Sequence, residues 1–304
     1  VPQHEPVVRV GFAMRRRKID VFTIVNTFLM IVLMVVTLYP FIYILNVSLS
    51  SEAYVLQGAV NLYPKGFTLE WYERVVKDDR IWTGYRNTLL YTAVGTAISL
   101  VLTSAGAFAL AQRHMVWRRP IMLLMVFTIL FSGGMIPSYL VVKGLGILDT
   151  MWAMILPGIV STYHLLIFRT FFEGLPEELF DAGKVDGLTD LGIFFRLAVP
   201  LSKAVYAAIG LFVAVGIWNN FSNALIYLKS PEKFPLQLIL RDLVIAGTLA
   251  AESASQSQQA GANPVVADSL KYATIMVSTL PILLLYPFLQ KYFVKGVLIG
   301  SVKG

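Results

Sequence analysis

The sequence predicts an all-α integral membrane protein with six transmembrane helices. Of its 304 residues, 57% are hydrophobic and only 14% are charged, and the mean hydropathy is +0.69. Soluble proteins contain roughly 25% charged residues, so this chain has too little polar surface for a soluble domain. The hydrophobic residues also gather in long segments without charge, which favours a bilayer over one large soluble core.

Six segments without Asp, Glu, Lys or Arg are the predicted spans. They are 21–45, 88–111, 121–142, 151–168, 204–228 and 272–290. At about 1.5 Å per residue, each can cross about 30 Å of hydrocarbon. The first lacks a small-residue cleavage site and is too long for a signal peptide, so we expect it to be retained. We therefore interpret 1–20 as an N-terminal segment and 21–304 as a single transmembrane domain.

The basic residues predict the orientation of these spans. The short loop 112–120 carries Arg113, Arg118 and Arg119 and no acid. Because cytoplasmic loops are enriched in Lys and Arg, both termini are expected in the cytoplasm, and the net charge of +7 does not indicate nucleic-acid binding. Loops 47–86 and 230–271 then lie outside. The small and polar segment 250–264 is either a flexible external loop with a function or only a linker.

The sequence disfavours chemistry by the chain itself. Without cysteine it has no disulfide or thiolate site, and with three histidines and no His-Glu-x-x-His motif it predicts no metal site. It contains no Gly-x-x-x-x-Gly-Lys-Ser/Thr loop for ATP phosphates and no Gly-x-Ser-x-Gly, although residue counts alone leave a Ser-His-Asp triad open. The predicted spans also lack carboxylates, which ion-coupled carriers usually place at membrane depth. The driving force for any transport is therefore expected from a partner.

A few polar and aromatic residues within the predicted spans could line a solute pathway. Sugars bind by stacking on aromatic rings and by hydrogen bonds to amides, which the fourth and fifth spans can supply. For His164, a hydrogen bond to a neighbouring helix is the alternative. If the chain works alone, it would be a secondary carrier or a channel for a polar solute. The candidate pathway residues are Tyr163, His164, Trp218, Asn219, Asn220 and Asn223.

The inner loop 172–200 predicts a short helix that could receive force from a cytoplasmic partner. Pro176 in the first turn, followed by Glu177 and Glu178 at the positive end of the helix dipole, favours a helix start. Gly187 favours its end. The alternative is an ordinary helix at the membrane surface. The small apolar face comprises Leu179, Ala182 and Gly183.

This loop also carries the residues by which the chain resembles a known family. Asp181-Ala182-Gly183, three residues, Gly187, nine residues and then Leu-Ala-Val-Pro at 197–200 resemble the EAA loop of ABC-importer permeases. The family pattern is Glu-Ala-Ala, x3, Gly, x9, Ile-x-Leu-Pro, and Val-Asp-Gly at 185–187 matches its usual context. The departures are Asp181, Gly183, Leu197 and Val199, which roughly keep size or charge class and could change docking strength.

The resemblance extends along the whole chain and points to carbohydrate uptake. Segments 37–41, 131–137, 235–238 and 286–296 are similar to permeases of the MalG-like class. Within that class, the chain is most similar to the LplC-like branch for oligosaccharides and polysaccharides, which includes permeases of alginate importers.

The resemblance implies a type I ABC-importer permease fold in a bacterial plasma (inner) membrane. It implies a second homologous permease, two cytoplasmic ATPase subunits that bind ATP and Mg, an extracytoplasmic solute-binding protein and a carbohydrate substrate. This chain itself would need no cofactor. Loop 250–264 would reach into the binding protein, and the tail 295–304 would contact the ATPases. The implied coupling helix, which docks on an ATPase, comprises Glu177, Glu178, Asp181, Ala182, Gly183, Asp186 and Gly187.

Overall fold

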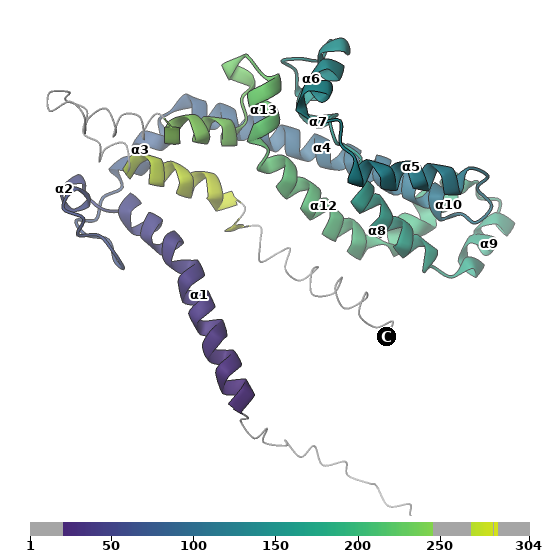
Figure 1. The fold of residues 1–304 in the computed structure, drawn as a ribbon, viewed down its shortest axis with the longest axis horizontal. Helices are drawn as coiled ribbons and strands as arrows, with labels where there is room; N and C mark the ends of the chain where they lie inside the picture. The colour runs from purple at the N-terminus through teal and green to yellow at the C-terminus, as the bar shows by residue number, and fades with distance from the viewer. Residues whose placement is uncertain (1–20, 246–268, 282, 285–304) are drawn as a thin grey trace, which may run out of the picture.

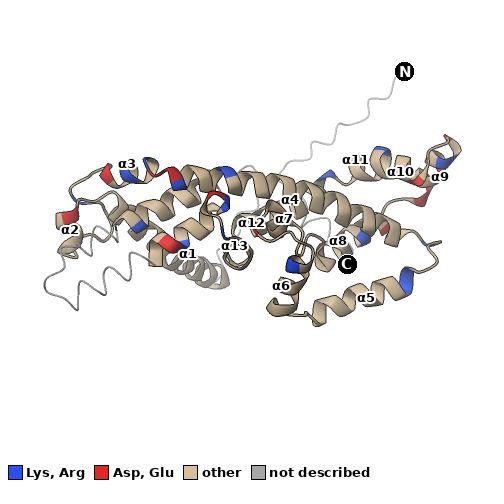
Figure 2. Ribbon diagram, turned by 90° about the horizontal axis from the view of Figure 1, so that it is seen from above, with Lys and Arg blue, Asp and Glu red and all other residues tan. Residues whose placement is uncertain are grey.

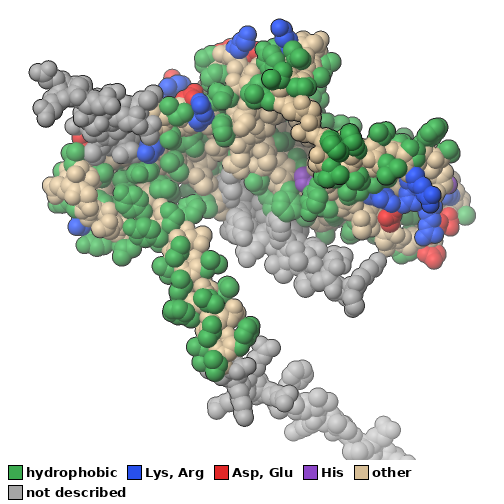
Figure 3. Space-filling model, in the orientation of Figure 1, with side chains coloured by type: hydrophobic (Ala, Val, Ile, Leu, Met, Phe, Trp, Pro, Cys, Tyr) green, Lys and Arg blue, Asp and Glu red, His purple; other side chains and the backbone are tan. Residues whose placement is uncertain are grey.

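A computed structural model describes residues 21–245, 269–281 and 283–284 of the chain (Figure 1). Within these residues the regular elements are helices, apart from one isolated β-bridge between Ser50 and Phe67, so the predicted helical class is confirmed. The first helix, α1 (Val21–Ser48), points away from the other helices. Hydrophobic side chains cover it along its length (Figure 3), and only Asn46, Val47 and Ser48 are buried.

The segment after α1 ties the end of that helix to the rest of the chain. It contains α2 (Glu52–Leu56) and α3 (Glu70–Val76). Trp71 is buried, and its indole Nε1 donates a 3.1 Å hydrogen bond to the Ser50 carbonyl. The hydroxyls of Ser48 and Tyr72 lie 2.8 Å apart. Buried aromatic rings with satisfied polar atoms therefore hold the end of α1 against α3.

Helix α4 (Asp79–Ala111) is the central element and begins nine residues before the predicted span 88–111. The Asp78 carboxylate caps it by accepting a 3.0 Å bond from Arg80 N. Several small polar side chains on α4 are buried, and three of them bond to irregular backbone nearby. Asn87 donates to the carbonyls of Glu232 and Phe234, at 2.8 and 3.0 Å. Because buried backbone groups outside regular helices need hydrogen-bond partners, these side chains make α4 a polar support of the fold.

Three of the predicted spans are interrupted in the structure, two of them before the inner loop. Segment 121–142 divides into α5 (Arg118–Leu130) and α6 (Met135–Gly144), which are bent by 119° at a glycine-rich break where Gly134 has φ +82°. Segment 151–168 divides into α7 (Met151–Ile155) and α8 (Thr162–Glu173). Between the latter pair, Pro157 and Gly158, with φ +75°, end the helical path. Each of these two segments was predicted as one spanning helix, and in the structure each contains two shorter helices.

The predicted inner loop folds into short helices that lead to a longer one. They are α9 (Glu177–Val185), α10 (Asp190–Ile193), the π-helical η1 (Phe194–Ala198) and α11 (Val199–Leu201). Helix α12 (Lys203–Trp218) then departs at an 84° bend. The predicted span 204–228 is also interrupted, because α12 ends at Trp218 and α13 (Phe221–Tyr227) starts anew.

The chain continues through the 3-10 turn η2 (Pro231–Lys233) and helical residues 236–245 and 269–281. Among the described residues, two helices are long and apolar enough to cross a membrane, or up to four if each bent pair counts as one span. Six spans therefore stay a prediction. Segment 1–20, loop 250–264, the tail 295–304, and residues 282 and 285–290 of span 272–290 lie outside the described residues.

The largest described hydrophobic core lies where α4, α8, α12 and the segment from α10 to η1 meet. Its fully buried side chains include Leu165 and Phe168 of α8 and Ile209 of α12. Phe108 of α4 contacts three other rings there, including that of Phe180 in α9. The core thus sits beside α9, at the end of the molecule where α5, α8 and α10 also lie (Figures 1 and 2).

Candidate functional site

Helix α9 forms as the local sequence predicted, although it ends at Val185 rather than at Gly187. Pro176 precedes its first residue, and Glu177 and Glu178 occupy the first turn. Gly187 has φ +78°, a conformation that side chains disfavour, and Leu188 N bonds the Gly183 carbonyl at 2.9 Å. This backbone bond caps the C-terminal end of α9.

One face of α9 packs on the chain and the other is open. The Phe180 ring lies edge-on to Phe108 of α4, at 5.9 Å between centroids. Gly183 lies against η1: a Cβ added there would be 3.0 Å from Cδ1 of Leu197. Gly183 is buried, whereas the other six predicted docking residues are exposed. These are Glu177, Glu178, Asp181, Ala182, Asp186 and Gly187.

A cavity of about 600 Å³ adjoins the start of α9. Its walls come from the α4–α5 loop, the end of α8 and the first turn of α9, and they include Gln112, Phe172 and Glu178. Arg113 Nη1 and Glu177 Oε2 lie 3.7 Å apart at its edge, with both side chains mostly exposed. The cavity and the exposed acids of α9 offer a partner protein a shaped and charged surface.

A second pocket, of about 220 Å³, lies between α4, the α7–α8 break and α12. It brings together His164 and Asn220, two of the predicted pathway residues. The His164 ring is nearly parallel to that of Phe212, with centroids 6.4 Å apart. Ser99 of α4 donates a 2.7 Å bond to the Ile159 carbonyl and fixes the broken backbone at the pocket wall. The other lining residues are Gly95, Met154, Ile155, Pro157, Gly158, Ser161, Val213, Gly216 and Ile217.

The other pathway candidates lie elsewhere. Tyr163 is 65% exposed and does not line the pocket. Trp218 is 5% exposed and packs in a core with Trp71 and the ring of Tyr85. Asn219 is exposed, and its side chain bonds the Val215 carbonyl at 3.0 Å.

Asn220 and Asn223 also have a local structural role. Asn220 Oδ1 accepts a 3.0 Å bond from Asn223 N and thereby caps the start of α13. Sequence reasoning missed Ser99, Ser161 and Phe212 as pocket residues. The Pro157-Gly158 pair was the signal for the break that opens this pocket.

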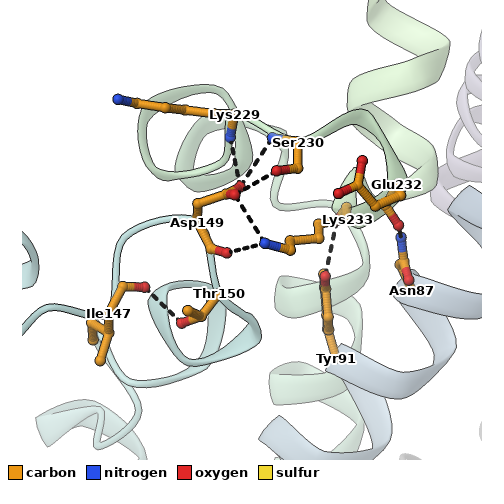
Figure 4. Close-up of polar contacts among 9 residues, drawn as sticks. All are labelled: Asn87, Tyr91, Ile147, Asp149, Thr150, Lys229, Ser230, Glu232 and Lys233. Atoms are coloured by element: carbon orange, nitrogen blue, oxygen red, sulfur yellow. Dashed lines mark hydrogen bonds and ion pairs between the residues drawn. The ribbon is translucent and has the colours of Figure 1, made fainter.

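A polar cluster that the sequence did not reveal joins the loop before α7 to the segment after α13 (Figure 4). The Asp149 carboxylate accepts bonds from the backbone N–H groups of Lys229 and Ser230, from the Ser230 hydroxyl and from Lys233 Nζ. The Ser230 hydroxyl first, and then the two N–H groups and Lys233, hold the pKa of Asp149 well below its usual range. Tyr91 of α4 donates to the Lys233 carbonyl at 2.9 Å.

Comparisons with known proteins place these features in context. Residues 110–299 match the family model described as binding-protein-dependent transport system inner membrane component. The chain is 45% identical to the protein LplC of Bacillus subtilis, over 88% of this chain and 90% of that protein. It is 42% identical to the polygalacturonan/rhamnogalacturonan transport system permease protein YtcP of Bacillus subtilis, over 87% and 92%.

A solved structure is also similar over nearly the whole chain. It is that of a bacterial ABC transporter involved in the import of the acidic polysaccharide alginate. The TM-score is 0.82 and the identity is 33%, with 91% of this chain and 98% of that chain covered.

Proposed function

Because this chain belongs to the family of inner membrane components of binding-protein-dependent transport systems, we propose that it is the permease subunit of an ATP-driven importer of oligosaccharide or polysaccharide fragments. Its relatives are permeases of ABC transporters, and such a subunit works with ATPase and solute-binding partners. We further propose a second homologous permease and two ATPases in the complex. Uronate fragments such as those of alginate are the first substrates to test, because the similar solved transporter imports alginate.

The observation that carries this proposal is the geometry of α9. Its exposed acidic face can dock on an ATPase, while Phe180 and Gly183 bind its opposite face to the core. A force applied to the exposed face therefore reaches the core through direct packing. This role as a coupling helix fits transport by rigid-body motion of helices around a central pathway.

The proposed pathway is the pocket between α4, the α7–α8 break and α12. His164 and Phe212 supply stacking surfaces, and Asn220 and Ser99 supply polar groups. Six spans with both termini in the cytoplasm are part of the same proposal. Family membership disfavours the alternative of a stand-alone carrier or channel.

Charge reversal on α9 tests the proposal. In a reconstituted complex, we expect Asp181→Lys to abolish the stimulation of ATP hydrolysis by loaded binding protein and to stop uptake. Glu73→Lys on α3 is the matched control, since both acidic side chains are 69% exposed and each lies within 4.0 Å of a lysine nearby in the sequence. Normal stimulated hydrolysis and uptake with Asp181→Lys would contradict the docking role.

A second variant acts through the backbone. Gly187→Pro is expected to distort the end of α9, because proline holds φ near −65° and Gly187 has φ +78°. We expect it to insert into the membrane and to fail in stimulated hydrolysis. Uptake by the purified chain alone, driven by an ion gradient and indifferent to ATP, would instead support the carrier.

A further inference from the structure

Two helix ends meet at one carboxylate next to α9. Glu173 is the last residue of α8, and its Oε1 lies 2.7 Å from Arg169 Nη2. The same oxygen accepts a hydrogen bond from Nη2 of Arg118, the first residue of α5. These side chains are between 23% and 33% exposed, so solvent screens them only in part.

Both arginines also bond the end of α4. The Nε atoms of Arg118 and Arg169 donate to the Leu110 carbonyl at 2.9 and 3.3 Å. Leu110 is the penultimate residue of α4, so its carbonyl belongs to the last turn, which has no partners within the helix. Cations are favoured at this negative end of the helix dipole. The cluster therefore joins the end of α4, the start of α5 and the end of α8.

Helix α5 has few other attachments to the described part of the chain. None of its side chains is buried, and Ile121, Met122 and Met125 pack only partly on the core. Near its other end, the hydroxyl of Thr128 lies 3.1 Å from that of Thr162 in α8. Loss of the Arg118–Glu173 contact would thus leave the start of α5 attached through the bond from Arg118 Nε to the Leu110 carbonyl.

The connection from this cluster to α9 is short. Only residues 174–176 separate Glu173 from Glu177, and two of them are fixed by backbone bonds. Gly174 N bonds the Phe171 carbonyl at 3.1 Å, and Leu175 N bonds the Phe172 carbonyl at 3.2 Å. The third is a proline with restricted φ. A displacement of α9 is therefore passed to Glu173 with little loss in the linker.

We propose that Glu173, Arg118 and Arg169 form a coupling clamp, which makes the ends of α4, α5 and α8 follow α9 as one body. This inference rests on the proposed function, since it takes α9 as the helix that the ATPase moves. In this proposal the three residues are positioning residues, which act through the helix ends that they join. Two planar guanidiniums that bind one carboxylate and one carbonyl fix the relative orientation of the helix ends as well as their separation. A single flexible ion pair does not fix the orientation.

The test uses the complete complex in proteoliposomes and measures substrate imported per ATP hydrolysed. Glu173→Gln keeps the shape of the side chain and removes its charge. In the complexes that assemble, we expect the substrate imported per ATP hydrolysed to fall by about tenfold, equivalent to about 1.4 kcal/mol. Glu70→Gln is the matched control, because it removes the carboxylate of a 2.6 Å pair with Arg74 on α3. The control should leave the ratio unchanged.

A distance measurement separates a clamp from a merely stabilising contact. The sequence contains no cysteine, so spin labels can be placed on cysteines introduced at Arg119 in α5 and Lys184 in α9. In the otherwise wild-type complex, we expect one label distance that nucleotide binding leaves unchanged. With Glu173→Gln, nucleotide binding should shift and broaden that distance.

If Glu173→Gln does not assemble, Arg169→Lys serves in both measurements, because it keeps the charge and loses the fork. An import ratio and a label distance equal to those of the wild type would overturn the clamp while leaving the importer intact. A wild-type complex without ATP-dependent uptake would overturn the proposed function, and the clamp with it.

Discussion

Asp149→Asn tests the polar cluster between the loop before α7 and the segment after α13. Asp149 Oδ1 accepts from Lys229 N and Ser230 N at 2.9 and 3.0 Å. Its Oδ2 accepts from the Ser230 hydroxyl at 2.5 Å and from Lys233 Nζ at 2.9 Å. The residue has φ 56°, which asparagine tolerates nearly as well as aspartate, so the substitution leaves the backbone unstrained.

The size of the effect follows from what asparagine can replace. Its oxygen can still accept from the two backbone N–H groups. Its amide NH2, however, meets the Lys233 ammonium, so the charge-assisted bond becomes a contact between two donors. Such bonds contribute about 1.5 to 3 kcal/mol when shielded, and the Asp149 side chain is 25% exposed. We therefore expect the free energy of unfolding to fall by about 1 to 3 kcal/mol.

Thermal unfolding of the purified protein in detergent measures this change. Lys229→Ala is the matched control: only the backbone of Lys229 bonds Asp149, and its side chain points away (Figure 4). We expect the control to have the same midpoint temperature of unfolding as the wild type. The midpoint of Asp149→Asn should lie several degrees lower. Equal midpoints for Asp149→Asn and the control would refute the assigned role of the carboxylate.

The pH dependence gives a second check on the same reasoning. The cluster lowers the pKa of Asp149 in the folded state, so the stabilisation is complete above the unfolded value of about 3.9 and is lost as pH falls through the lower folded value. The difference between the wild type and Asp149→Asn should be constant from about pH 5 to 8 and should shrink below about pH 4. A difference that grows on acidification would contradict this sign.

Three further predictions concern glycines. Gly216→Leu should reduce uptake without unfolding the protein, because Gly216 lines the proposed pathway and an added Cβ there would meet no atom within 4 Å. The control is Gly144→Leu, at a position with equally open surroundings outside the pocket. Gly183→Ala should lower the thermal midpoint and weaken ATPase stimulation, since its Cβ would lie 3.0 Å from Leu197, and adding Leu197→Ile should restore both. Gly84→Ala should destabilise by about 1 to 3 kcal/mol in denaturant unfolding, since its Cβ would lie 3.0 Å from the backbone of residue 236; a stability equal to that of the wild type would contradict this packing.

The sequence predicted those features that depend on local chemistry. Helix α9 was predictable because Pro176, the acids after it and Gly187 act within a few residues of one another. The pairing of Gly183 with Leu197 also corresponds to two departures from the family pattern. In the structure, Cδ1 of Leu197 lies 3.0 Å from where a Cβ at position 183 would stand, so the two departures share one packing contact.

Features that depend on contacts between distant segments were not predictable. Hydropathy alone does not show the breaks at Gly134 and Gly158, because a break changes no charge, although the Pro157-Gly158 pair was a local signal for the second one. Trp218 was expected in a solute pathway, but burial against Trp71 depends on tertiary packing. Asp149 and Ser230 are 81 residues apart, and no local pattern joins them.

The pocket next to the α7–α8 break has a consequence for how a charged sugar would be recognised. Among the described residues that line it, none is Asp, Glu, Lys or Arg, and the polar side chains are two serine hydroxyls, one amide and one imidazole. Such a lining can hydrogen-bond a sugar but offers no lysine or arginine to pair with a carboxylate. If the pocket is the pathway that we propose, an anionic sugar would cross it without such an ion pair inside this subunit. The charge of that sugar would then have to be recognised by another component of the importer.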